Sequence, residues 1–195
     1  MNKLVYAPHL YPYSLHEGGP YTAKDQKNVK DWHRERLKEV KKHGNIPLVC
    51  GEFGLSPNSE GYDRYLNDVH EIFDTNLWHW AYWSNDDGNW SPLTHADEET
   101  PILKELIRAY PKATAGRIRS FNYNKEENIF TMDYVSKSNI SQPTEIFIPN
   151  RFFTNGFNVE VETTAKYHYD YNEKNQVVSL YVEGQADVKV TISGK

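Results

Sequence analysis

The chain has 195 residues, a formal net charge of −5 and 38% hydrophobic residues, which is enough for one domain or two small ones. Its 14 tyrosines and five tryptophans argue against disorder, because disordered chains are poor in aromatic residues. The mildly acidic balance lacks blocks of Lys and Arg, so it predicts no nucleic-acid partner, and no apolar run approaches the ~20 residues of a transmembrane segment. The single Cys50 excludes an internal disulfide and a multi-cysteine metal site.

The chain opens on strand-like sequence, with a β-prone run from Lys3 to Ala7. No signal peptide or leading helix precedes this run, so the sequence assigns no localisation. Prolines and glycines between Tyr11 and Pro20 predict a loop. A helix is expected to begin at Thr22, which forms an approximate capping box with Asp25, and to end at Gly44.

Two further strand and helix pairs follow. Ile46–Cys50 is an apolar run without polar alternation, which is typical of a strand buried on both faces in a parallel sheet. An amphipathic helix over 62–73 comes next, and Leu77–Trp83 is the third strand. A third helix is predicted from Thr100 and Pro101, and Pro111 is expected to stop it. This alternation predicts parallel strands joined by right-handed crossovers.

The second half of the chain changes character at about Gly116, where the helical period disappears. Short β-rich runs separated by turn residues predict an antiparallel β-sandwich. We therefore predict two domains, a β/α portion over 1–113 and a sandwich over 114–195. The predicted sandwich strands are 120–123, 128–135, 144–148, 157–161, 165–171, 176–182 and 187–192.

Polar and aromatic residues follow the three predicted strands of the first half, where β/α folds place their functional groups. Glu52 lies between two glycines after an apolar strand; it is a candidate functional carboxylate or, equally, a loop cap or a partner of an arginine. His9 and Tyr11 fit a pair of donors that orients a carboxylate or a sugar hydroxyl, although a strand-end histidine in a polar loop is common. Trp83 is either a sugar-stacking platform or a core residue.

Metal chemistry has little support in the sequence. Residues 85–89 contain Asp and Asn but lack the alternating ligand spacing of a calcium loop, so a solvated turn is expected. The eight histidines show no metal-ligand spacing, and Cys50 lies inside an apolar strand as a small buried hydrophobe.

Three sequence elements, in this order, resemble family 5 glycoside hydrolases of the endoglycoceramidase group. They are Tyr6-Ala7-Pro8-His9-Leu10-Tyr11, Pro47-Leu48-Val49-Cys50-Gly51-Glu52-Phe53-Gly54 and Trp80-Ala81-Tyr82-Trp83-Ser84. The resemblance implies the last part of a (β/α)8 barrel, strands six to eight, followed by a C-terminal β-sandwich. It covers the whole chain.

The resemblance also implies the chemistry. Glu52 would be the nucleophile of a retaining β-glycosidase, His9 and Tyr11 would line the site, and Trp83 would form the floor of the glycone subsite. The substrate would be a β-glycoside, either a glycolipid or an oligosaccharide, and neither a metal nor an organic cofactor is implied. A full-length parent is expected to be secreted.

One part of the family pattern is absent. Retaining hydrolysis needs a second carboxyl group about 5 to 5.5 Å from the nucleophile, and in this family it is the Glu of an Asn-Glu pair after strand four. No matching pair occurs here, and nothing in the sequence aims Glu17 or Asp86 at Glu52. We therefore expect a missing N-terminal barrel half as a partner and at most weak activity of this chain alone.

An alternative hypothesis is a non-catalytic carbohydrate- or glycolipid-binding module with a vestigial barrel remnant. In this case the sandwich would bind its ligand through Tyr167, Tyr169 and Tyr171, which share one face of an alternating strand. The same tyrosines could instead pack in the core of the sandwich.

Overall fold

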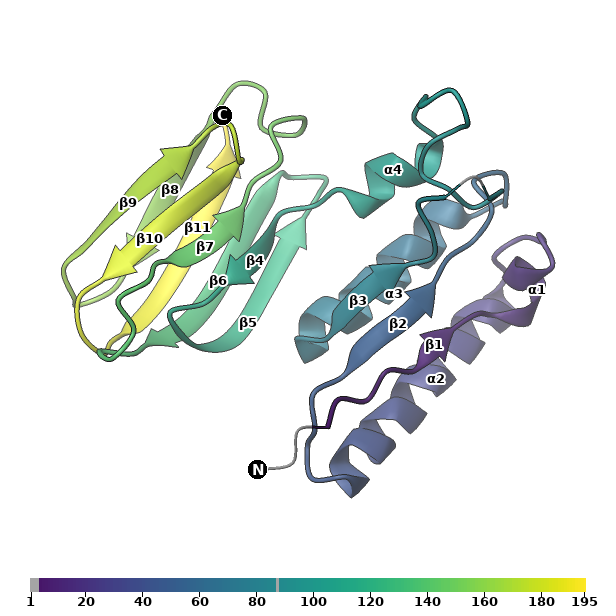
Figure 1. Cartoon of the computed structure of the whole chain (residues 1–195), viewed down its shortest axis with the longest axis horizontal. Helices are drawn as coiled ribbons and strands as arrows, with labels where there is room; N and C mark the ends of the chain where they lie inside the picture. Colours follow the sequence, from purple (N-terminus) through teal and green to yellow (C-terminus); the bar gives the residue numbers. More distant parts are fainter. Residues whose placement is uncertain (1–3, 87) are drawn as a thin grey trace. The chain divides into compact units, whose positions relative to one another are not determined.

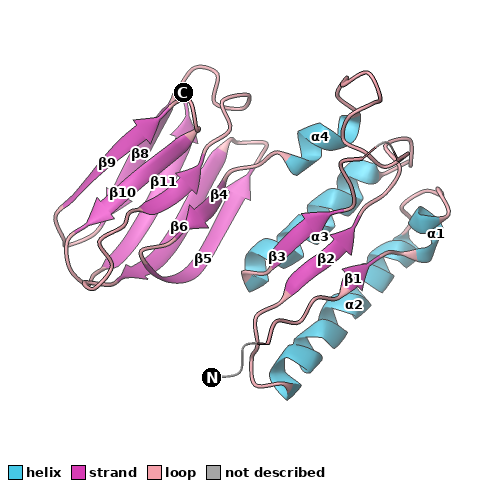
Figure 2. Ribbon diagram, in the orientation of Figure 1, coloured by secondary structure: helices cyan, strands magenta, loops and turns pink. Residues whose placement is uncertain are grey.

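The computed structural model describes residues 4–86 and 88–195. They form two compact units, residues 1–106 and residues 107–195. All the α-helices lie in the first unit, and the second consists of strands and loops (Figure 2). Within these described residues, no helix is both long and apolar enough to cross a lipid bilayer.

The first unit is built on a three-stranded parallel sheet with the order β1-β2-β3 (Figure 1). The strands are β1 (His9–Leu10), β2 (Val49–Phe53) and β3 (His79–Tyr82). Four helices accompany them: α1 (Tyr13–His16), α2 (Ala23–Lys42), α3 (Tyr62–Asn76) and α4 (Pro101–Leu106). The predicted parallel pairing is confirmed.

Helix α2 begins as its sequence predicts. Thr22 is the N-cap: its hydroxyl accepts from the backbone N–H of Asp25, and the Asp25 carboxylate accepts from the backbone N–H of Thr22 at 3.0 Å. A cap of this kind contributes about 1 kcal/mol to helix stability. The helix ends at Lys42, and Gly44 adopts a φ of 83°, which a side chain would disfavour.

The core of the first unit lies between the sheet and α3. Phe53 is completely buried, and its ring meets those of Phe73, Trp80 and Tyr82 edge-on at centroid distances of 5.3, 5.5 and 5.5 Å. Edge-to-face pairs at these distances are favourable for aromatic rings. The end of β2 is therefore anchored by a residue next to Glu52.

Several predicted boundaries are wrong, including that of the second strand, which is Val49–Phe53 rather than 46–50 and so contains Glu52. The first regular strand is His9–Leu10 rather than 3–7, with Tyr6 in an isolated bridge to Leu48; residues 1–3 lie outside the described part. Helix α1 lies within the predicted loop, where the buried Leu15 anchors it. Helix α4 ends at Leu106, and Pro111 lies in the unpredicted β4 (Tyr110–Ala113). That strand is at a sheet edge, which tolerates a residue without an N–H.

The second unit is an antiparallel β-sandwich of two four-stranded sheets, with the orders β4-β7-β10-β9 and β5-β6-β11-β8. Inward residues such as Phe130, Tyr134, Val178 and Val190 form one continuous core. The assignment of residues 1–113 to a glycosidase barrel and of residues 114–195 to a C-terminal domain stays a prediction. The remaining strands are β5 (Gly116–Asn124), β6 (Ile129–Ser136), β7 (Thr144–Phe147), β8 (Phe157–Glu162), β9 (Tyr167–Asn172), β10 (Val177–Val182) and β11 (Asp187–Gly194).

The three tyrosines of β9 have different environments. Tyr171 packs against the core and meets Phe157 edge-on at 4.9 Å, whereas Tyr167 and Tyr169 are 44% and 43% exposed. Tyr171 is therefore a packing residue, and only two of the three tyrosines are available as a surface.

Candidate active site

The carboxyl ends of β1, β2 and β3 bring the predicted site residues to one edge of the sheet. His9 lies beside Glu52 in the parallel register, and Phe53 lies beside Tyr82. The backbone N–H of Trp83 donates to the carbonyl of Phe53 at 2.8 Å, which extends the pairing past the end of β3. Parallel strands end together, and functional groups of β/α folds collect at this edge.

An irregularity in β2 turns Glu52 away from the helices. Cys50 pairs with Trp80 and Phe53 pairs with Tyr82. Between these two pairs β2 has two residues, Gly51 and Glu52, whereas β3 has only Ala81. Such a bulge changes which face the following side chains point to. Cys50 and Phe53 both enter the helix-side core, while Glu52 contacts His9 across the sheet edge.

Glu52 is held through one of its two oxygens. The Tyr11 hydroxyl donates to Oε2 at 3.1 Å, and Nδ1 of His9 lies 3.3 Å from the same oxygen. The Glu52 side chain is 28% exposed. Within the described residues no hydrogen bond engages Oε1, so this oxygen remains free for an incoming group.

Burial and the neighbouring Glu52 carboxylate raise the pKa of Tyr11 well above its ordinary value. Tyr11 therefore stays protonated and keeps donating to Glu52 throughout the neutral range. Burial also raises the pKa of the Cys50 thiol to about 12, and the thiol donates to the Glu52 carbonyl at 3.3 Å. Cys50 is thus a neutral packing residue, as predicted, because a nucleophilic cysteine needs an accessible thiolate.

Trp83 lies on the cleft into which Glu52 opens. The side chain of Trp83 is large and apolar, yet the residue is 49% exposed. The cleft has a volume of about 420 Å³. Aromatic walls with few polar groups are typical of small-molecule sites. The lining residues are Tyr11, His16, Glu52, Trp83, Ser84, Asp86, Gly88, Asn89 and Trp90.

Sequence reasoning missed His16 and Trp90. The rings of Tyr11, His16 and Trp90 meet pairwise at 5.7 to 5.8 Å and form an aromatic wall of the cleft. His16 is brought there by α1, and Trp90 is held through its carbonyl, which accepts from the Tyr82 hydroxyl at 2.9 Å. An aromatic residue in the polar segment after β3 was the available signal for Trp90, because binding residues favour such loops.

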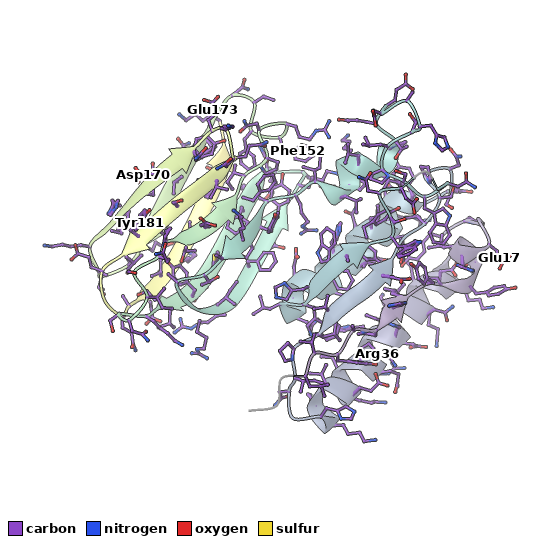
Figure 3. All side chains as sticks on the ribbon, viewed as in Figure 1. Glu17, Arg36, Phe152, Asp170, Glu173 and Tyr181 are labelled. Atoms are coloured by element: carbon purple, nitrogen blue, oxygen red, sulfur yellow. The ribbon has the colours of Figure 1, made fainter. Side chains whose placement is uncertain are left out.

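The described lining of the cleft offers one further carboxylate that could serve as a general acid. Asp86 lines the cleft, but its carboxylate accepts hydrogen bonds from the Ser84 hydroxyl and the Gly88 N–H, and these lower its pKa. A general acid needs the opposite shift. Glu17 caps α1 and is absent from the cleft lining (Figure 3). Asp87 lies outside the described residues, and among those described no group of three or more His, Cys, Asp or Glu could hold a metal.

Two family descriptions match the chain. The cellulase description (glycosyl hydrolase family 5) matches residues 1–89, and the glycoside hydrolase family 5 C-terminal domain matches residues 108–193. The first match includes His9, Tyr11, Glu52 and Trp83.

Individual proteins similar to this chain are endoglycoceramidases and a sterylglucosidase. Endoglycoceramidase I of Rhodococcus hoagii (strain 103S) is 24% identical over 158 residues, which are 79% of this chain and 29% of that protein. The solved endo-glycoceramidase II from Rhodococcus sp. in complex with ganglioside GM3 has a TM-score of 0.86 at 22% identity over all of this chain and 43% of its own. Cryptococcus neoformans sterylglucosidase 1 has a TM-score of 0.63 at 14% identity over 87% of this chain and 32% of its own.

The chain thus spans less than half the length of the relatives it matches. The two matches to one family, in the order expected for a catalytic and a C-terminal domain, and the similarity to endoglycoceramidases in both sequence and fold lead to one assignment. The chain belongs to glycoside hydrolase family 5 and is endoglycoceramidase-like.

Proposed function

We propose that this chain carries the nucleophile of a retaining β-glycosidase whose substrate is a glycosphingolipid or a related β-glucoside. The observation that carries the proposal is the Glu52 carboxylate, which is fixed through Oε2 and has Oε1 free beside a half-exposed tryptophan. The solved endo-glycoceramidase II structures include a lactosyl-enzyme intermediate and a ganglioside GM3 complex, which support this reaction class and substrate.

In the proposed reaction, Oε1 of Glu52 attacks the anomeric carbon of a β-linked sugar. The bond between that carbon and the aglycone oxygen breaks, the oxygen takes a proton from an acid, and a glycosyl ester with Glu52 remains. Water then attacks the same carbon and releases the sugar, while the acid, now a base, takes a proton from that water. Tyr11 and His9 hold the carboxylate in place, and Trp83 supports the apolar face of the sugar.

We further propose that the acid/base carboxyl group belongs to a further barrel segment. Asp86 is the one other carboxylate in the described lining of the cleft, and its lowered pKa does not suit an acid. The sheet of the first unit also has room for more strands, since β1 and β3 each pair with β2 alone in the described chain. Leu4 and Val5, which precede β1, are 54% and 53% exposed. A segment that pairs with these edges would complete the barrel.

The nucleophile can be tested separately from the acid. A 2-deoxy-2-fluoro-β-glucoside with a dinitrophenolate leaving group needs no proton donor, and the fluorine slows breakdown of the glycosyl-enzyme. Incubation of the 195-residue chain with this reagent should add one fluoroglucosyl group to the peptide that contains Glu52, as detected by mass spectrometry. Glu52→Gln should remain unlabelled, whereas Tyr169→Ala, at an exposed tyrosine of the second unit, should be labelled like the unchanged chain.

Labelling elsewhere, or none in a folded chain, would contradict the role of Glu52. An unactivated alkyl or lipid β-glucoside, in contrast, should be hydrolysed no faster than a trace rate, because its leaving group requires the acid. Normal enzymatic turnover of this second substrate by the chain alone would contradict the proposal that the acid lies on another segment.

The second candidate function is a carbohydrate- or glycolipid-binding module, which the exposure of Tyr167 and Tyr169 favours. Calorimetric titration with oligosaccharides and glycolipid micelles distinguishes the two functions. Loss of binding in Tyr169→Ala but not in Glu52→Gln would support the module; the opposite result would support the cleft.

A further inference from the structure

The β-sandwich has a recess of its own, of about 120 Å³. It lies where the end of β10 and the start of β9 meet the loop between β6 and β7, which covers residues 137–143. The recess is lined by Ala115, Tyr134, Ser136, Lys137, Ile140, Ser141, Gln142, His168, Tyr181, Val182 and Glu183.

Tyr181 provides a fixed aromatic surface in this recess. It lies opposite His168 in the antiparallel register of β9 and β10, and the two rings are stacked with centroids 4.6 Å apart and planes within 6°. The neighbouring Leu180 and Val182 pack toward the sandwich core, so Tyr181 stands on the outer face of its sheet (Figure 3). The ring is therefore held by its neighbour rather than by the core.

Polar side chains without a hydrogen-bond or ion-pair partner among the described residues line the same recess as this ring. Lys137, Ser141, Gln142 and Glu183 line the recess, and none of their side chains forms a hydrogen bond or ion pair within residues 4–86 and 88–195. Together they present an ammonium group, a hydroxyl, an amide and a carboxylate, so both donors and acceptors are available. One positive and one negative charge leave no net charge, which favours a neutral polar ligand over an ion.

We propose that this recess binds a single neutral sugar ring, with the apolar face of the pyranose on Tyr181 and its hydroxyls bonded to Gln142 and Glu183. Enclosed ligand sites have volumes of roughly 300–1,000 Å³, so the recess accommodates one ring with a face left in water and not a buried oligosaccharide. The inference goes beyond the proposed glycosidase function, because the recess belongs entirely to the second unit and shares no residue with the cleft.

The test is a titration of the 195-residue chain carrying Glu52→Gln, followed by ¹H–¹⁵N correlation spectra, with methyl β-glucopyranoside and lactose as probes. The backbone amides of 141, 142, 182 and 183 should shift in a saturable way. Tyr181→Ala and Gln142→Ala should each weaken the apparent affinity roughly tenfold, as loss of one stacking surface or hydrogen bond predicts. Tyr110→Ala, at an exposed tyrosine of β4 that does not line the recess, is the matched control and should leave these shifts unchanged.

Absence of saturable shifts at tens of millimolar sugar would overturn the proposal, and so would equal shifts in the Gln142→Ala chain. Gln142 is exposed on a loop, so this variant keeps the test decisive even where Tyr181→Ala perturbs β10. Sodium acetate and inorganic phosphate serve as competing probes; shifts with these but not with sugars would show an ion site instead. Shifts confined to residues 9–11 and 83–90 would report the cleft and also overturn the recess.

Discussion

Gly54 allows the most direct test of how the cleft is built. An ideal Cβ at this position would lie 2.2 Å from the carbonyl oxygen of Trp83 and 3.3 Å from Cε3 of Trp90. Carbon and oxygen atoms in contact prefer separations of about 3.5 Å, so the Trp83 carbonyl would have to retreat by about 1.3 Å in Gly54→Ala. The backbone N–H of Trp83 donates to the carbonyl of Phe53, which fixes this stretch of backbone. Moving the Trp83 carbonyl would therefore cost free energy.

We expect Gly54→Ala to destabilise the first unit by about 1–3 kcal/mol, the usual cost of adding a methyl group to a packed site. Gly51→Ala is the matched control on the same strand. Its Cβ would lie 3.1 Å from Nε2 of His9, whose side chain is 50% exposed and can rotate away. The cost of Gly51→Ala should therefore stay within about 0.5 kcal/mol.

Tryptophan fluorescence during urea unfolding isolates this effect, since all five tryptophans lie between residues 32 and 90 and so report on the first unit. With a slope of about 2 kcal/mol/M, Gly54→Ala should lower the urea midpoint by roughly 0.5–1.5 M. Equal midpoints for the two variants would refute the reasoning that the Trp83 carbonyl is fixed against Gly54.

Three further predictions follow from the site and its supports. Tyr11→Phe removes a hydrogen bond to the Glu52 carboxylate and should slow fluoroglucosyl labelling of Glu52 by about tenfold; an unchanged labelling rate, measured by mass spectrometry, would show that Tyr11 does not position the nucleophile. Burial raises the pKa of Cys50 and of Tyr82 to about 12, so the folded state retains protons that the unfolded state loses, and stability should be complete below about pH 9 and fall between pH 9 and 12; urea midpoints by tryptophan fluorescence should show this decline and a smaller one in Cys50→Ala. Thr22→Ala removes the cap of α2 and should cost about 1 kcal/mol, whereas Thr22→Ser, which keeps the hydroxyl, should cost less in the same assay.

Much of the local structure was accessible from the sequence because it depends on short-range rules. The capping box at Thr22, the apolar faces of the helices and the alternation of Val188, Val190 and Ile192 each predicted an element that is present. Helix α4 and strand β4 were misjudged for a tertiary reason. Ala109 enters the core of the second unit, and Pro111 is accommodated at a sheet edge that the sequence does not mark.

The candidate site was likewise predictable from the sequence only in part. The parallel order of three strands is sufficient to predict that His9, Glu52 and Trp83 share one edge, since strand ends in such sheets coincide. The sequence does not indicate that a bulge turns Gly51 and Glu52 to the open face, because a register shift depends on the partner strand. Nor does it place His16 and Trp90 around Tyr11, since Trp90 is more than 70 residues away from both and His16 is positioned by α1, which lies in a predicted loop.

By itself, then, the sequence determined the order of the strands and helices apart from α1 and β4, the family resemblance and the residues at the strand ends, because these depend on periodicity and motif. Only the tertiary structure decided which oxygen of Glu52 stays free and which aromatic rings form the wall of the cleft. It also showed that Tyr171 packs against the sandwich core while Tyr181 lies on the outer face of its sheet. The physical reason is common to all of these: orientation and burial depend on the partners that distant parts of the chain bring into contact.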